Sequence, residues 1–420
     1  MRTMKDSGIE WIGQIPQDWP LNRLQYCLSE IKVQNNPVQS EQVLSLVKDV
    51  GVMLYEEKGD VGNKAKADVS EYKLAFPNTL IVNSMNILIG SVGISKYYGC
   101  VSPVYYVFKE TDSSDLRFVN YIFNTREFQK ELRKYANGIL EIRLRVSADD
   151  IFKRPVPLPV KTEQKRIADF LDSKCAEIDA LSADIQSEID TLEAYKRSKV
   201  FDSVSHGVKN TAFKETDSDV WSSIPHGWKL VDIKYLFEIV KRIAGKEGYD
   251  ILAITQQGLK IKDISSNEGQ LASDYSGYQF VYPGDYAMNH MDLLTGWVDL
   301  SDKFGVTSPD YRVFRLRDTE HFYRKYYMYI MQCCYMCRIF YSLGQGVSNL
   351  GRWRLQTSAF NNFKVPVPPY EEQVEIGKHL DEAIGDINTI ISQKQEQLAV
   401  LADYKKSVIY EYVTGKKEVV

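Results

Sequence analysis

The chain consists of two copies of one unit, and this duplication constrains the fold more than any other feature. The later parts of the copies align without a gap at an offset of 209 residues, which matches Val156 with Val365 and Leu171 with Leu380. The openings align at the same offset, with IPQDW starting at Ile15 and IPHGW at Ile224. A period this long indicates a duplicated domain, not a solenoid repeat. A duplicated domain gives one chain an internal pseudo-two-fold symmetry like that of a homodimer.

Composition places the chain among ordinary globular proteins. It has 420 residues, of which 44% are hydrophobic and 26% charged, enough for two to four domains. No apolar run approaches the roughly 18 residues of a membrane span. The opening MRTMKDSGIE lacks the apolar core of a signal peptide. We expect a cytoplasmic protein that does not associate with a membrane.

The cysteines do not predict a metal site. Cys333, Cys334 and Cys337 contain one C-x-x-C, whereas structural zinc needs four ligands and no second pair stands at a suitable distance. We expect these thiols to pack in an apolar helix with Met331 and Met336.

Each copy divides into a globular part and a long helix. The globular parts, roughly 15–158 and 224–367, mix short β-type runs with one helical stretch and close in a proline cluster, RPVPLPV or KVPVPP. This mixture predicts α+β domains. The expected β runs in the first copy are 79–89 and 101–108, and the expected helices are 117–135 and 320–341.

After each proline cluster, a narrow apolar stripe continues for about 40 residues, which would make a helix about 60 Å long. A stripe so narrow and long calls for a partner helix, and the two copies can pair with each other as an antiparallel coiled coil. The alternative is that each helix only caps its own domain. Leu181, Tyr195 and Tyr404 belong to the stripe, and its predicted pairing residues are Leu171, Ile178, Ile185 and Leu192 in the first helix and Leu380, Ile387, Ile391 and Leu401 in the second.

Basic residues are unevenly distributed. Residues 303–364 carry ten Lys and Arg against three Asp and Glu, among many aromatic side chains, and residues 121–154 carry eight against five. Local basic patches with aromatic neighbours are typical of nucleic-acid contact. For any single residue, the alternative is a solvated helix face.

The ordered set of motifs resembles the specificity subunit of type I restriction-modification systems. It comprises an opening DSGIEWIGQIPQDW, a variable domain closing in P-x-P, an EQ-x-x-I helix start at Glu163 and again at Glu372, helix ends at Tyr195 and Tyr404, and a terminal VTGK. The resemblance covers essentially the whole chain.

This resemblance implies two tandem target-recognition domains, each reading one half of a split site in double-stranded DNA, with the helix pair as spacer. It implies two methyltransferase subunits that modify adenine N6 with S-adenosylmethionine, and two restriction/translocase subunits that use ATP and Mg. The specificity chain itself would be noncatalytic and without a cofactor. The expected division is 1–158 and 207–367 for the recognition domains, and 159–206 and 368–420 for the spacer helices.

Motif absences agree with a noncatalytic chain. The sequence has no G-x-x-x-x-G-K-[ST] loop for nucleotide phosphates. Val367-Pro368-Pro369-Tyr370 resembles the tetrad of amino-methyltransferases, but valine cannot accept a hydrogen bond from the amine. Glu56-Glu57-Lys58 could be the carboxylate-lysine end of a nuclease site, but it lacks a convincing acidic partner upstream. A self-sufficient methyltransferase or nuclease is therefore disfavoured.

Each domain carries a glycine-led polar loop with an Arg-x-Arg before its proline cluster. Arginine can pair with guanine or clamp phosphate, and asparagine can pair with adenine. The predicted DNA-binding residues are Arg143 and Arg145 for the first half-site and Asn349, Arg352 and Arg354 for the second, with Lys96, Tyr97, Gln256, Gln257 and Lys303 as secondary candidates. For each arginine, the alternative is a surface ion pair.

Two globular parts that differ in sequence on a common frame favour two different half-sites, which we expect about 34 to 36 Å apart, one helical turn of DNA. The rival interpretation is a noncatalytic coiled-coil adaptor that binds proteins and never reads bases. The basic, aromatic stretch from 303 to 364 argues against it.

Overall fold

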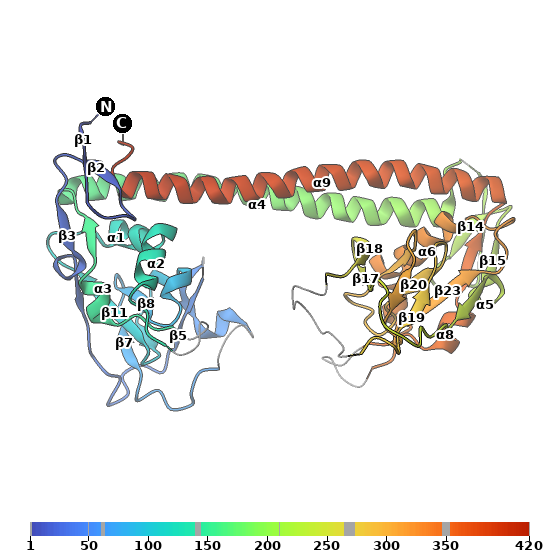
Figure 1. Cartoon of the computed structure of the whole chain (residues 1–420), viewed down its shortest axis with the longest axis horizontal. Helices are drawn as coiled ribbons and strands as arrows, with labels where there is room; N and C mark the ends of the chain where they lie inside the picture. Colours follow the sequence, from blue (N-terminus) through green and yellow to red (C-terminus); the bar gives the residue numbers. More distant parts are fainter. Residues whose placement is uncertain are drawn as a thin grey trace. The chain divides into compact units, whose positions relative to one another are not determined.

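The computed structural model describes residues 2–48, 50–59, 64–138, 144–209, 211–263, 274–346 and 353–419. The chain forms two compact units, which we call unit 1 (Met1–Ile185 with Glu396–Val420) and unit 2 (Gln186–Gln395). Two long helices, α4 (Lys161–His206) and α9 (Tyr370–Val413), each contribute one segment to unit 1 and one to unit 2 (Figure 1).

Unit 1 is built around an antiparallel four-stranded sheet of order β4-β11-β8-β9. Phe108 of β11 lies opposite Leu80 of β8, which lies opposite Ile94 of β9. Four two-stranded ladders accompany the sheet: β1–β2, β3–β12, β5–β6 and β7–β10. The strands are β1 (Met4–Asp6), β2 (Gln14–Pro16), β3 (Leu21–Arg23), β4 (Leu28–Glu30), β5 (Leu44–Val47), β6 (Gly51–Leu54), β7 (Lys73–Ala75), β8 (Leu80–Asn83), β9 (Val92–Ile94), β10 (Gly99–Val101), β11 (Tyr105–Glu110) and β12 (Pro155–Pro157).

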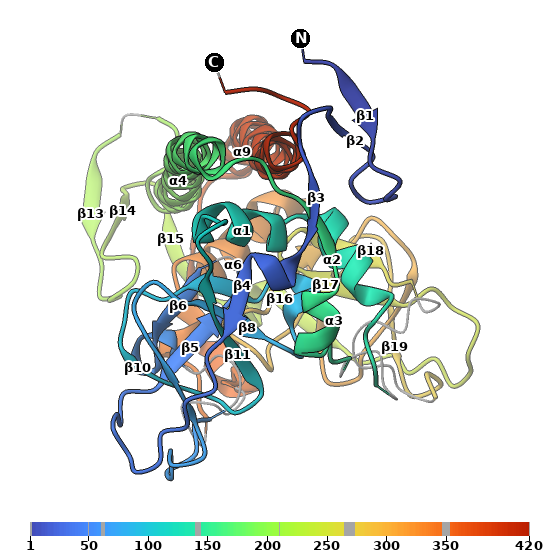
Figure 2. The same cartoon turned by 90° about the vertical axis from the view of Figure 1, so that its left-hand side faces the viewer.

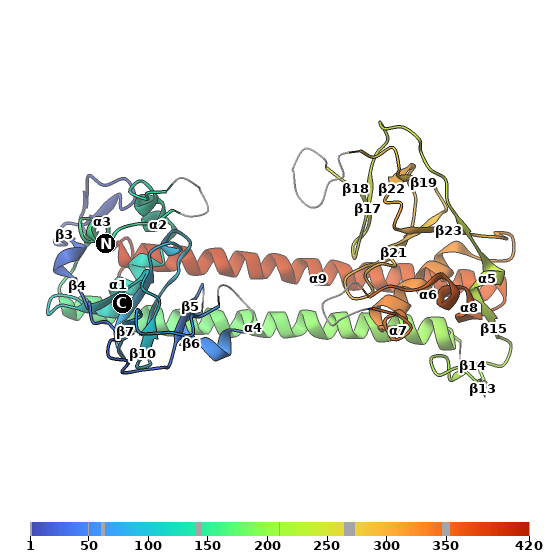
Figure 3. The same ribbon diagram turned by 90° about the horizontal axis from the view of Figure 1, so that it is seen from below.

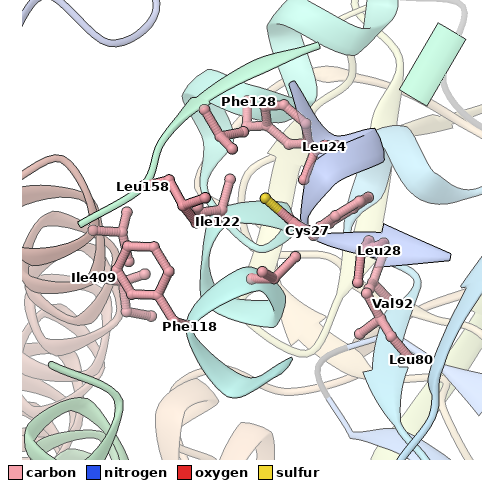
Figure 4. Close-up of a cluster of buried hydrophobic side chains, with 14 of the residues drawn as sticks. Leu24, Cys27, Leu28, Leu80, Val92, Phe118, Ile122, Phe128, Leu158 and Ile409 are labelled. Carbon is pink, nitrogen blue, oxygen red and sulfur yellow. The ribbon is translucent and has the colours of Figure 1, made fainter. Parts of the chain in front are cut away.

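Both faces of this sheet are buried, because successive side chains of a strand point to opposite sides. Leu80 and Phe108 join a cluster with α1 (Leu116–Phe123), α2 (Arg126–Arg133), α3 (Ala148–Phe152) and the end of α9, as Figure 4 shows around Phe118 and Ile409. Ile81 and Val107 face the ladders β5–β6 and β7–β10. The result is three layers: helices, central sheet and small ladders.

The single helix predicted over 117–135 is wrong, because the chain breaks between α1 and α2. The Thr125 hydroxyl accepts a hydrogen bond from the Phe128 amide at 3.3 Å and starts α2 there. The predicted run 79–89 is also shorter: β8 ends at Asn83, and a 3-10 turn, η3 (Ile87–Ile89), precedes Gly90 at φ 83°. The run 101–108 divides between β10 and β11. The other 3-10 turns of unit 1 are η1 (Leu24–Tyr26) and η2 (Tyr55–Lys58).

Unit 2 has the same topology, with a central sheet of order β16-β23-β20-β21 and ladders β13–β14, β15–β24, β17–β18 and β19–β22. Figure 3 shows β17 and β18 on one side of β21, with α6 and α7 on the other. The strands are β13 (Phe213–Glu215), β14 (Ser223–Pro225), β15 (Lys229–Asp232), β16 (Phe237–Val240), β17 (Leu252–Thr255), β18 (Gly258–Ile261), β19 (Gln279–Val281), β20 (Tyr286–Met288), β21 (Val298–Leu300), β22 (Gly305–Thr307), β23 (Arg312–Leu316) and β24 (Lys364–Val367).

The helices of unit 2 are α5 (Ile233–Leu236), α6 (Arg324–Met336), α7 (Ile339–Ser342) and α8 (Thr357–Asn362). The predicted helix 320–341 is therefore interrupted, since Arg338 adopts a left-handed conformation with φ 55° between α6 and α7. Cys333 and Cys334 are buried in α6 as predicted, but Cys337 lies beyond its end and is exposed.

The prediction of two long antiparallel helices is confirmed within each unit. In unit 1 the rings of Phe170 and Tyr412 lie 4.4 Å apart, and Lys405 pairs with Asp179 at 2.6 Å. In unit 2 Lys394 pairs with Glu188, and Lys196 donates to Asn388 at 2.8 Å. Figure 2 shows the two helices side by side above α1. Of the eight predicted pairing residues, Leu192 and Leu401 are partly buried and the rest are buried.

Three stripe residues do not take part in the buried surface. Leu181 is 49% exposed, Tyr195 55% and Tyr404 46%, so these members of the stripe face solvent in part. A stripe with a strict repeat drifts around a straight helix, which turns its outer members away from the partner helix.

The start of each long helix is held by a buried glutamine. The Gln164 side chain accepts from the Asp115 amide at 2.8 Å and donates to the Pro159 and Ser113 carbonyls. Gln373 makes the same bonds in unit 2, to the Tyr323 amide and to the carbonyls of Pro368 and His321. The preceding glutamates, Glu163 and Glu372, accept from the indoles of Trp19 and Trp228. The EQ motif therefore anchors each helix to its own globular part.

Candidate nucleic-acid interface

Each unit carries one irregular hairpin where the sequence predicts DNA contact. The Asn137 and Arg145 backbones exchange two hydrogen bonds of 2.9 Å, and those of Gln345 and Arg354 exchange bonds of 3.0 and 3.1 Å. We call residues 137–145 and 345–354 the recognition hairpins. Their tips, 139–143 and 347–352, lie outside the described residues, and so do the predicted contacts Arg143, Asn349 and Arg352.

Arg145 and Arg354 occupy the same position in the two hairpins. Each is the last bridged residue, and each has an exposed side chain. The next residue in each case donates its amide to the loop that follows a central strand: Val146 to the Ser84 carbonyl at 3.1 Å, and Leu355 to the His290 carbonyl at 3.0 Å. Both arginines are therefore attached at their backbones to the central sheet.

A side chain from the middle strand supports the end of each hairpin. In unit 1 the Tyr106 hydroxyl donates to the Val146 carbonyl at 3.2 Å. In unit 2 the Arg312 guanidinium donates to the Leu355 carbonyl at 3.1 Å and to the Thr357 hydroxyl at 3.3 Å. The two units thus make one contact with different side chains, a neutral phenol and a cation.

Arg312 is a buried cation without a carboxylate partner among the residues the structure describes. Its side chain lies over the Phe360 ring, 4.5 Å from the centroid, and the residue is 4% exposed. Burial, with a smaller contribution from the charge of Arg354, lowers the pKa of Arg312 to about 10. A buried unpaired cation is costly, which makes this position a candidate for function.

A buried histidine, His290, interacts with both of these arginines. Burial, followed by the charges of Arg312 and Arg354, lowers the pKa of His290 to about 3. The imidazole is therefore neutral at physiological pH, and its Nδ1 atom has no hydrogen-bond partner within the described ranges. We call Arg312, Arg354 and His290 the unit 2 basic group.

The corresponding place in unit 1 is also positive, with a different residue set. Lys73 donates to the Tyr105 carbonyl at 2.6 Å. Burial lowers the pKa of Lys73, the charge of Glu30 opposes the shift, and the charges of Lys32 and Arg145 add to it. Glu30 lies 3.3 Å from Lys32 and 4.0 Å from Lys73, so one carboxylate faces two cations.

The glutamine candidates lie at the tip of the β17–β18 hairpin. Gln256 and Gln257 are exposed, and Gln256 donates to the Thr295 carbonyl at 3.5 Å. The loop containing Thr295 is bonded to the recognition hairpin, since the Leu293 amide donates to the Trp353 carbonyl at 3.2 Å. In unit 2 the structure therefore brings the glutamines and Arg354 into one connected set of loops.

The remaining candidates, Lys96, Tyr97 and Lys303, lie in a different turn. In both units a serine hydroxyl closes this turn: Ser95 bonds to both backbone groups of Tyr97, and Ser301 to both of Lys303. The Lys303 amine forms a surface ion pair with Asp302 at 2.6 Å, which weakens the case for Lys303 as a DNA contact. This turn joins to the ladders β7–β10 and β19–β22, not to the recognition hairpins.

Aromatic packing holds the unit 2 hairpin where it leaves α7. The Trp353 indole donates to the Tyr341 carbonyl at 2.6 Å and stacks on the Tyr341 ring at 5.3 Å. Gly344 and Gly346 lie against this indole so closely that a Cβ atom would come within 2.4 Å of it. Unit 1 has Leu144 in place of Trp353, so the two hairpins are supported differently.

Sequence reasoning missed Tyr106, Arg312, His290 and Lys73. The one available signal was Arg312, a cation at the start of the apolar strand RVFRL. Among the described residues, no group of three His, Cys, Asp or Glu could hold a metal ion. Nor does any helix within those ranges have the length and apolar character to cross a membrane.

Comparison with known proteins agrees with the duplicated architecture. Over 96% of this chain and 95% of its own, a specificity subunit assigned to type I restriction enzyme MjaX of Methanocaldococcus jannaschii is 22% identical. The MjaVIII specificity subunit of the same organism is 23% identical over 62% of this chain and 61% of its own.

The fold also matches a solved chain from a study of complex assembly and conformational transition of the type I R-M system. Its TM-score is 0.68 at 14% identity, covering 96% of this chain and 99% of that one. Residues 28–191 and 225–400 each match the family described as the type I restriction modification DNA specificity domain. The chain therefore belongs to that family and carries two copies of its domain.

Proposed function

We propose that this chain is the noncatalytic DNA-specificity subunit of a type I restriction-modification complex, in which each unit reads one half of a bipartite site in double-stranded DNA. One observation carries the proposal: the units share one sheet topology, while their recognition hairpins differ in sequence and in the side chains that support them. A common frame with different contact residues is what two different half-sites require.

We assign recognition to residues 1–158 and 207–367, and spacing to residues 159–206 and 368–420. Arg145, Arg354, Gln256 and Gln257 are the described residues with the strongest case for DNA contact. Arg143, Asn349 and Arg352 remain sequence-based candidates, and Lys96, Tyr97 and Lys303 are weaker ones.

Catalysis belongs, in this proposal, to partners: two adenine-N6 methyltransferase subunits using S-adenosylmethionine, and two restriction/translocase subunits using ATP and Mg. Exposed apolar side chains on the long helices support two equivalent docking places. Leu181 and Tyr404 lie in unit 1, and their copies at the 209-residue offset, Ile390 (41% exposed) and Tyr195, lie in unit 2. Exposed apolar residues repeated in this way suit one partner bound twice.

The test is to co-express the chain with the adenine methyltransferase encoded beside its gene and to map N6-methyladenine in the host DNA. We expect a split motif that requires this chain. Exchange of residues 15–158 or 224–367 for those of a relative should change one half of the motif at a time. A stable complex that adds no methylation would contradict the proposal and favour the coiled-coil adaptor.

A further inference from the structure

Because the chain contains two copies of one domain, residues that contact phosphates can be distinguished from residues that contact bases by comparison of the two units. Two different half-sites present different base edges, but every half-site presents the same phosphates. A DNA-binding residue found at the same position in both units, with the same backbone attachment, therefore suits the part of DNA that does not vary. Arg145 and Arg354 meet this condition.

Two other solvent-accessible arginines, Arg315 and Arg117, pair with carboxylates. Arg315 lies 3.0 Å from Glu238, and Arg117 lies 2.7 Å from Asp172. Arg145 and Arg354 make no ion pair within the described residues. Their charges are thus available to an anionic ligand, which argues against the surface ion-pair alternative.

In unit 2, further positive charge lies behind the exposed arginine. Arg312, which is 4% exposed, supplies this charge. His290 is 6% exposed and neutral, and its Nδ1 atom has no partner among the described residues. Arg354 interacts electrostatically with both. A buried cation in a region of low dielectric raises the positive potential at the surface above it, where an anion binds.

In unit 1, Tyr106 makes the hydrogen bond that Arg312 makes in unit 2, and the additional positive charge comes from Lys32 and Lys73. Arg145 interacts with the partly buried Lys73, and Glu30 offsets only part of the cluster's charge. Both units therefore provide additional cations near the equivalent arginine, although the residues that do so are not copies of each other. Positive charge is thus kept at this position in both units although the residues that supply it differ. This indicates that the same kind of anionic ligand binds to both units.

We propose that Arg145 and Arg354 each bind a phosphate of the DNA backbone at the end of a recognition hairpin, and do not read bases. This assignment rests on the proposed function. Arg312 is a positioning residue that acts through Arg354. It donates to the Leu355 carbonyl and the Thr357 hydroxyl, close to Arg354 in the sequence, and is itself buried.

The test uses the full chain in complex with its methyltransferase partner and a 40-base-pair duplex of random sequence. Binding is measured for Arg145→Ala, Arg354→Ala and the double variant across a series of KCl concentrations. Loss of one phosphate contact should reduce the slope of log K against log salt by about 0.9, and should weaken binding about fivefold at 0.15 M salt. Arg354→Lys should restore most of the slope, because lysine also binds phosphate as a point charge.

Arg315→Ala is the matched control, being an exposed arginine of the same unit that is already paired with Glu238. It should leave the slope unchanged. Equal thermal unfolding midpoints for all variants would show that the fold is intact, as expected for exposed side chains.

Methylation mapping in cells provides the second readout. Arg145→Ala and Arg354→Ala should lower the extent of methylation without changing the recognised motif. Relaxation of the motif at one base pair, or an unchanged salt slope, would overturn the assignment. Absence of any split motif with the unmodified chain would instead contradict the proposed function, and the random-duplex measurement would still test the phosphate contacts.

Discussion

At the scale of single residues, buried side-chain amides join the long helices to the globular parts. Gln164 is fully buried and satisfies one backbone amide and two carbonyls that belong to unit 1. Gln164→Leu leaves these groups unpaired and should destabilise unit 1 by about 1–3 kcal/mol. Gln373→Leu should do the same in unit 2. Chemical unfolding would measure both effects.

The matched control is Gln186→Leu on α4, whose side chain is exposed and bonded only to Asp190. It should change stability by less than about 0.5 kcal/mol. Equal effects of Gln164→Leu and Gln186→Leu would contradict the anchoring role.

His290 makes the stability of unit 2 depend on pH. Its pKa is about 3 in the folded chain, against 6.5 for an unperturbed imidazole. Protons therefore bind the unfolded state preferentially as the pH falls from 6.5 toward 3. Stability is fully present above pH 6.5 and decreases below it.

His290→Met removes this titration. Between pH 6 and 4 the variant should lose less stability than the parent, by about 1 kcal/mol per pH unit. Thermal unfolding of unit 2 across this range would measure the difference. The exposed His226→Gln should behave like the parent, and a parallel decline in parent and His290→Met would show that the imidazole is already solvated.

At the scale of elements, the long helices present apolar side chains that their mutual packing leaves uncovered. Leu181→Asp with Tyr404→Asp changes unit 1 alone, and Ile390→Asp with Tyr195→Asp changes unit 2 alone. If each pair docks one methyltransferase subunit, either double variant should bind one partner tightly and the other at least tenfold more weakly.

Native mass spectrometry of the complex would count the bound partners. Ser187→Asp, an exposed polar change on α4, serves as control and should retain two. Retention of two partners by both double variants would exclude these side chains from docking.

The helices were predictable because their pattern is local: apolar spacing, the EQ start and the absence of proline act within a few turns. The break between α1 and α2 was not predictable, since it depends on tertiary packing: Thr125 caps α2 while Phe123 and Phe128 on either side of it are buried in the core. Arg145 and Arg354 could be found from Arg-x-Arg. Arg312 left one signal, a cation in an apolar strand. His290 and Lys73 left none, because the fold brings them to the hairpins from distant positions in the sequence.

At the scale of the whole molecule, the function predicts a defined distance between the half-sites. With the helices as spacer, we expect the halves about 34 to 36 Å apart along the DNA. Insertion of half a turn, about 5 base pairs, into the mapped target should abolish specific binding, because the second half-site then faces away. An electrophoretic shift assay would measure this, with a same-length substitution inside the spacer as control. Specific binding to the target with the insertion would contradict the role of the long helices as a spacer of fixed length.

The ion pair between Arg2 and Glu418 has a consequence for how the chain could be connected. Arg2 also contacts Glu163, so the residues near both ends of the chain meet at the start of α4 in unit 1. In unit 2 the corresponding connection is part of the chain itself, because α4 ends at His206 and β13 begins at Phe213. A gene that joined residue 418 to residue 2 and opened between residues 206 and 213 should therefore encode the same two globular parts in reversed order, with a covalent link where Arg2 and Glu418 now form an ion pair.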